Sequence, residues 1–252
     1  MLEPIKSEAF GFAYEVKETA RGILFRTLSA LFNKGNDKSS PDNQKWHTIS
    51  LQNLPQTLLL LAESGNEDFD KIRSVVNSAF NYFQFSAYMS IGTLYKVEKL
   101  YQTERANLGL ANVLKSMGDL ERRLGDTVSA QKHYEEAEKL YKTERANLGL
   151  ANVLRSMGDL ESRLGDINSA ISKYLSAYSL YAQERYLVGK VYCTAELCLS
   201  YAKNKNTVCF SKYANETISA AESVNESVQI YALTCVSEAM NILGISTLND
   251  LD

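Results

Sequence analysis

The chain has 252 residues, of which 45% are hydrophobic, and a formal net charge of −3 at pH 7. This composition suffices for a folded core, and the slightly acidic balance argues against nucleic-acid binding, which needs a clearly basic face. No apolar run approaches the ~18 residues of a membrane-spanning helix. The cysteines (Cys193, Cys198, Cys209 and Cys235) match no paired zinc spacing, and no signal peptide precedes them, so we expect buried thiols in a cytoplasmic protein.

Residues 1–66 are predicted to form an N-terminal helical segment. An apolar stripe at helical spacing indicates a helix up to about residue 33, a polar loop follows at 34–43, and a second helix covers about 44–63. A stripe of this kind is typical of a terminal helix packed on its own domain. The alternative is an amphipathic helix that lies on a membrane surface.

Two 40-residue units lie end to end at 104–143 and 144–183, and 27 of their 40 positions are identical. Self-similarity at a fixed period predicts a stacked-repeat architecture. Fainter copies indicate degenerate units at 67–103 and 184–223, so the array is expected to cover 67–223. Residues 224–252 are expected to form a capping helix from about Glu226 to Leu243, ended by Gly244, and a tail.

Each clear unit is predicted to be a helix–turn–helix. Gly125-Asp126 forms the first turn, because glycine permits the left-handed conformation that ends a helix and aspartate caps the next one. The first helix then covers about 104–124 and the second about 128–142. Gly118 lies in mid-helix, where glycine costs ~1 kcal/mol relative to alanine. Its recurrence at Gly158 predicts a close approach between helices.

The small and large residues of these helices resemble the tetratricopeptide signature, in its long class of about 40 residues. The residues that carry the resemblance are Gly118, Gly125, Ala130, Tyr134 and Ala137, repeated as Gly158, Gly165, Ala170, Tyr174 and Ala177. Leucine replaces the aromatic residue of the first helix, and the closing proline is absent. The resemblance implies an all-α, right-handed α-α superhelix whose first helices line a concave groove.

One polar stripe of the first helix would therefore face this groove. It comprises Arg105, Asn112, Lys115, Asp119 and Arg122, with equivalents Arg145, Asn152, Arg155, Asp159 and Ser162. The resemblance implies that the two asparagines bind backbone amides of a ligand and that Lys115 and Arg155 bind its acidic groups. The alternative is that these residues only solvate the groove or pair internally, as Lys115 with Asp119.

No catalytic, cofactor or metal motif appears, and His133 occupies a position filled by Lys173 in the sister unit, which suggests an ordinary outer-face residue. We therefore expect a non-enzymatic adaptor or scaffold that binds a peptide or helix of another protein, possibly acidic, without cofactor or metal. One alternative is a self-assembling subunit that uses an aromatic surface (Tyr174, Tyr178, Tyr181, Tyr186 and Tyr192). A second alternative is a membrane-surface adaptor that uses the N-terminal helix.

Overall fold

The structure is a computed structural model, and it describes residues 94–95, 98–99, 101–102 and 105–248. These residues contain helices and no strand, which confirms the predicted all-α class. The helices are α5 (Asn107–Leu124), α6 (Thr127–Thr143), α7 (Asn147–Leu164), α8 (Ile167–Gln183), α9 (Leu187–Lys203), α10 (Thr207–Ala221) and α11 (Glu226–Leu243). The chain divides into two compact units, residues 1–109 and 110–252. The helices predicted within 1–66, and nearly all of the unit predicted at 67–103, lie outside the described residues.

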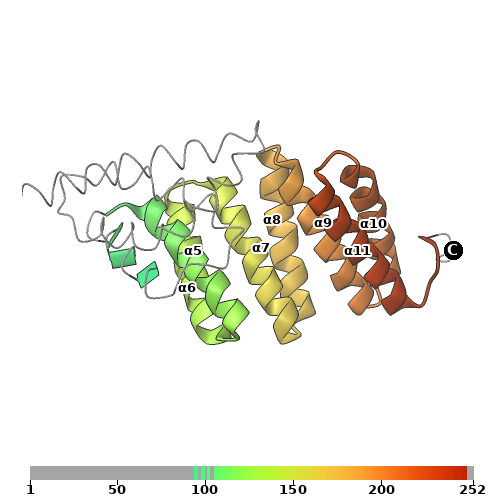
Figure 1. Ribbon diagram of the computed structural model, residues 1–252, viewed down its shortest axis with the longest axis horizontal. Coiled ribbons are helices and arrows are strands. Elements are labelled where there is room, and N and C mark those ends of the chain that lie inside the picture. Colours follow the sequence, from blue (N-terminus) through green and yellow to red (C-terminus); the bar gives the residue numbers. More distant parts are fainter. Residues whose placement is uncertain (1–93, 96–97, 100, 103–104, 249–252) are drawn as a thin grey trace, which may run out of the picture. The chain divides into compact units, whose positions relative to one another are not determined.

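Helices α5 to α10 form three helical hairpins in sequence order (Figure 1). Gly125 has a φ of +87°, and the carboxylate of Asp126 accepts a hydrogen bond from the backbone N–H of Ser129 at 3.1 Å. The second hairpin repeats this geometry. In the third hairpin, Lys205 takes the left-handed conformation, and Asn206 caps α10. The predicted Gly-Asp turns are thus confirmed, and the weaker third pair closes with different residues.

The turns between hairpins are longer than we expected. Arg145 has a φ of +53°, and the backbone N–H of Ala146 donates to the carbonyl oxygen of Tyr141 at 2.9 Å, so α7 begins only at Asn147. Arg105 has the same left-handed backbone, with a φ of +52°. The prediction that Arg105 and Arg145 lie on the first helices is therefore wrong, because the preceding helix needs a left-handed residue to end.

Two buried tyrosines on each of α6 and α8 hold the array together. A Cβ placed on Gly118 would lie 2.6 Å from the ring of Tyr134, and one placed on Gly149 would lie 2.3 Å from the ring of Tyr141. The second copy repeats both contacts, Tyr174 against Gly158 and Tyr181 against Gly189. The close approach predicted at the mid-helix glycines is confirmed, and the second tyrosine adds a joint to the following hairpin.

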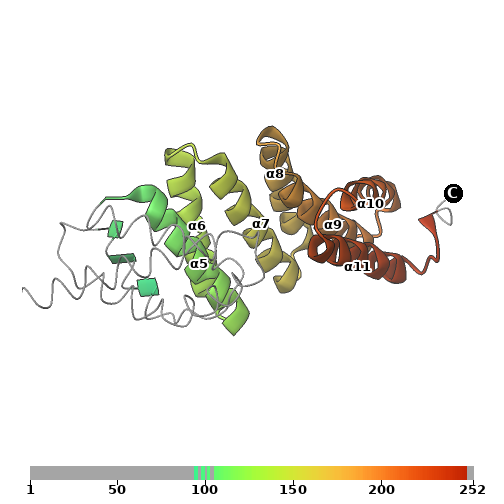
Figure 2. The same ribbon diagram turned by 45° about the horizontal axis from the view of Figure 1, so that its top comes forward.

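Helix α11 spans the predicted residues and ends at Gly244, which has a φ of +70°. It packs mainly against α9 and also against α10. In Figure 2, α11 lies on the same side of the array as the first helices α5 and α7. The last helix is therefore not stacked beyond α10 as a simple end cap.

Candidate functional site

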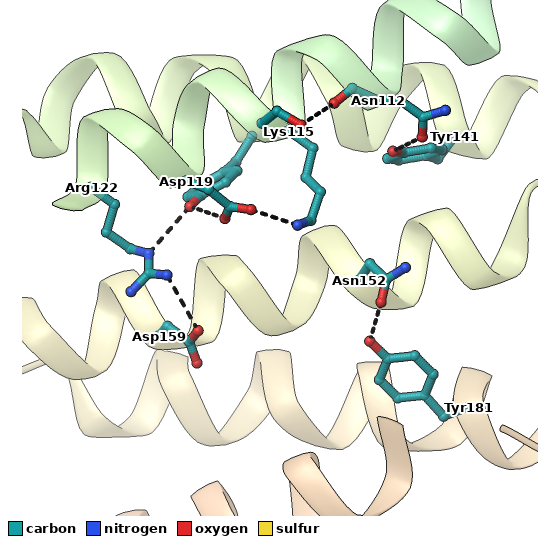
Figure 3. A network of polar contacts seen from close by, with 10 residues as sticks. Asn112, Lys115, Asp119, Arg122, Tyr141, Asn152, Asp159 and Tyr181 are labelled. Carbon is teal, nitrogen blue, oxygen red and sulfur yellow. Dashed lines mark hydrogen bonds and ion pairs between the residues drawn. The ribbon is translucent and has the colours of Figure 1, made fainter. Parts of the chain in front are cut away.

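The predicted polar stripe exists on α5 and α7, and we call it the polar face. It consists of Asn112, Lys115, Asp119 and Arg122 on α5, and of Asn152, Arg155, Asp159 and Ser162 on α7. Three- and four-residue spacing places each set along one side of its helix, and Figure 3 shows Lys115, Asp119 and Arg122 of α5 grouped with Asp159 of α7, while Asn152 turns toward Tyr181. Arg105 and Arg145 are not part of it, because they lie in turns.

The two asparagines are held by the tyrosines that join the hairpins. The hydroxyl of Tyr141 donates to Oδ1 of Asn112 at 2.7 Å, and that of Tyr181 donates to Oδ1 of Asn152 at 2.6 Å (Figure 3). Burial raises the pKa of both tyrosines, so they remain protonated donors. Each amide has its acceptor occupied. Within the described part of the chain, its Nδ2 group has no hydrogen-bond partner, so the face presents two oriented N–H₂ donors.

Lys115 is engaged internally. Its ammonium lies 2.6 Å from Oδ2 of Asp119, and the residue is only 5% exposed. Burial alone would raise the pKa of Asp119, but the charge of Lys115 and the hydroxyl of Tyr134, which donates at 2.8 Å, hold that pKa below its usual value. The internal pairing considered from the sequence is therefore what the structure shows for Lys115.

A chain of polar contacts connects α5 to α7. Nη2 of Arg122 lies 3.8 Å from Oδ2 of Asp159, and Nε of Arg122 donates to the hydroxyl of Tyr134 at 3.3 Å. The hydroxyl of Tyr174 donates to Oδ1 of Asp159 at 3.0 Å. These contacts fix the two halves of the polar face relative to one another.

Arg155 is also constrained. Its guanidinium lies 5.1 Å from the centre of the Tyr192 ring, a cation–π contact between α7 and α9. Burial lowers the pKa of Arg155, but Asp159 together with Tyr181, Cys193 and Asp119 outweighs this and raises it, so the charge is retained. Arg155 thus keeps its positive charge at the point where the polar face meets α9.

The polar face stops at α9. The residues of α9 that lie 40 positions after Asn152, Arg155 and Asp159 are Tyr192, Ala195 and Leu199. These apolar side chains pack in one cluster with Val228, Ala232 and Cys235 of α11. The side that is polar on α5 and α7 is therefore apolar on α9, and α11 covers it there.

His133 does not lie on the outer surface, so that expectation is wrong. It is 8% exposed, and its Nδ1 lies 2.6 Å from Oε2 of Glu121, which is 5% exposed. The signal was present in the sequence, because His133 follows Ala130 at a three-residue step on the core stripe of the second helix. The expectation of an exposed position came from Lys173, which fills the equivalent position in the sister unit.

The aromatic surface proposed for self-assembly is largely internal. Tyr174 and Tyr181 are 0% and 1% exposed, because their rings pack on glycines of the first helices. Tyr178 and Tyr192 are half-buried, and of the five only Tyr186 is well exposed, at 41%. This set cannot form one surface for a second copy.

The described residues offer little for other chemistry. They contain no group of three or more His, Cys, Asp or Glu side chains that could hold a metal ion. Burial raises the pKa of the Cys193, Cys198 and Cys235 thiols to about 12, which makes them poor nucleophiles. None of the helices described has the length and apolar character needed to cross a membrane.

The fold and the polar face define a helical-repeat protein with an ordered array of donors and charges along its first helices. Residues 109–183 match the tetratricopeptide repeat model, so this part of the chain belongs to the tetratricopeptide repeat family and forms its all-α solenoid. Repeats of this family generally mediate protein–protein interaction and are typically non-catalytic.

Two further comparisons add no function. No curated protein matches the chain. Among solved structures, the chain is similar to the crystal structure of BtubC (BKLC) from P. vanneervenii, with 14% identity and a TM-score of 0.46 over 89% of this chain and 91% of that chain. This likeness is too weak to support an inference about fold or function.

Proposed function

We propose that the protein is an adaptor that binds a segment of another protein along the polar face of α5 and α7. The observation that carries the proposal is the pair of amide groups of Asn112 and Asn152, whose acceptors are fixed by tyrosines while their N–H₂ donors have no partner among the described residues. Two oriented donors, one on each of two first helices, suit two backbone carbonyl oxygens of a bound segment.

The charge of the face supports a partner with some acidic character. The polar face carries three cations (Lys115, Arg122 and Arg155) against two carboxylates (Asp119 and Asp159). Because Lys115 is paired with Asp119, the surplus lies toward Arg122 and Arg155. An acidic side chain of the bound segment would balance it there, and a set of captured segments that is mainly basic would contradict this part of the proposal.

The test replaces both asparagines by aspartate and compares the variant with the native chain as baits for affinity capture, read by mass spectrometry. Asn112→Asp and Asn152→Asp keep the oxygen that accepts the tyrosine hydroxyl, replace each N–H₂ donor by a second oxygen and add one negative charge per site. Alanine would instead orphan two buried hydroxyls and weaken the fold. We expect partners held by the native chain to be lost from the double variant.

The matched control is Asn168→Asp. Oδ1 of Asn168 also accepts an internal hydrogen bond, from Nδ2 of Asn204 at 2.8 Å, but Asn168 lies in the first turn of α8, away from the polar face. The control adds one such charge away from the polar face, where the double variant adds two on it, and should retain the partners. Partners held equally by the native chain and the Asn112/Asn152 double variant would refute the proposed site.

A further inference from the structure

Helix α11 lies on α9 at the place that corresponds to the polar face of α7. The covered side chains of α9 include the repeat equivalents of Asn152, Arg155 and Asp159, and they pack against small or branched residues of α11 (Val228, Ala232 and Cys235). In the regular array, successive first helices make few contacts, whereas α9 and α11 contact one another extensively. α11 therefore occupies the ligand-facing side of a first helix.

The edge of this contact that faces α7 is polar. The hydroxyl of Tyr231 on α11 donates to Oε1 of Glu196 on α9, and the rings of Tyr231 and Tyr192 lie 5.0 Å apart. Burial and the negative charge of Asp159 raise the pKa of Glu196. The Tyr231 hydroxyl donates to this carboxylate and partly offsets the cost of keeping it ionised. A single hydroxyl thus secures the edge of α11 next to the proposed binding site.

We propose that the side of α9 that α11 covers is a docking surface for an amphipathic helix, that α11 is its resident occupant, and that a partner helix with small apolar residues at the contact can replace α11. This inference rests on the proposed function, because it extends the partner-binding surface from α5 and α7 to α9. It identifies the chemistry of that partner segment: a helix with the spacing of Val228, Ala232 and Cys235 and a hydroxyl at the position of Tyr231.

The cysteines allow opening of α11 to be measured in the full chain. Cys235 lies on the covered side of α11, whereas Cys193 is buried among residues of α7 and α8 that α11 does not cover. Burial raises the pKa of both thiols to about 12, so their intrinsic reactivities are comparable; Tyr231 lowers the pKa of Cys235, so its loss would by itself slow the labelling of Cys235 and not speed it. Alkylation followed by peptide mass spectrometry should label Cys235 faster than Cys193. Tyr231→Phe should raise the Cys235 rate on the order of 10-fold, since a hydrogen bond to a charged group is lost, and leave Cys193 unchanged.

The second arm uses a fluorescent synthetic peptide of residues 225–245 as the probe. We expect it to bind the full chain and to bind Tyr231→Phe on the order of 10-fold more tightly, because the resident helix competes less. The same peptide with Ala232→Glu should not bind, because it would bury a charge against α9. Absence of peptide binding, or labelling of Cys235 only together with Cys193, would overturn the proposal. Because the probe is the chain's own helix, either result would leave the asparagine test of the proposed function unaffected.

Discussion

The mid-helix glycines can be tested by Gly158→Ala. In an unconstrained helix interior, alanine is favoured over glycine by ~1 kcal/mol. Here the new Cβ would lie 2.6, 2.8 and 3.0 Å from three ring carbons of Tyr174, which is fully buried and donates its hydroxyl to Asp159. Overpacking of a core costs about 1–3 kcal/mol. The overpacking should exceed the helical gain, and we expect a net destabilisation of up to about 2 kcal/mol.

Urea unfolding followed by circular dichroism measures this change, and a double-mutant cycle identifies its cause. In a Tyr174→Leu background, the ring carbons are gone, so Gly158→Ala should become neutral or stabilise by up to about 1 kcal/mol. Gly118→Ala is the matched variant, because its Cβ would also lie 2.6 Å from a tyrosine ring, that of Tyr134. Stabilisation by Gly158→Ala in the native background would refute the reasoning.

Three further outcomes follow from the buried polar groups. Tyr181→Phe removes the hydroxyl that orients Asn152, so it should cost about 1 kcal/mol in urea unfolding and also reduce partner capture, although Tyr181 is itself buried. His133→Ala leaves the carboxylate of Glu121 buried without its imidazole partner and should cost about 1–3 kcal/mol in the same assay, part of which Glu121→Gln should restore. The pKa of Asp119 lies below its usual 3.8, so its stabilisation is present above that value and is lost as pH falls through the lowered pKa; Asp119→Asn should flatten urea midpoints measured from about pH 5 to about pH 2.

Much of the fold could be predicted because the turns of each repeat are determined by residues within the turn itself. Gly125 and Asp126 specify a turn through backbone freedom and capping, which depend on no distant residue. The penalised Gly118 indicated a close neighbour, and the structure identifies it as Tyr134. Gly149 carried the same information, but it lies near the start of α7, where a glycine is less conspicuous than in mid-helix.

The sequence predicted most of the residues that share the polar face, but it predicted fewer of their hydrogen bonds and ion pairs. Spacing along a helix places Asn112 and Lys115 on one side, and both lie there. Spacing allowed the pairing of Lys115 with Asp119 as one alternative, but it does not say that Tyr141, 29 residues later, occupies the amide oxygen of Asn112. Such pairings depend on how successive hairpins pack, which is a property of the assembled array.

The position of α11 also depends on how the assembled array packs. Once the array is known, the residues of α9 that α11 covers can be interpreted. Taken alone, Tyr192, Ala195 and Leu199 look like decay of the repeat. Aligned with the polar face of α7, they form a side that has become apolar only where a later helix covers it. An uncovered apolar side would expose hydrophobic area to water, whereas a covered polar side would bury donors without partners. Polarity along the first helices and coverage by α11 therefore change together, which is the relation expected if this side of every first helix is built to be occupied.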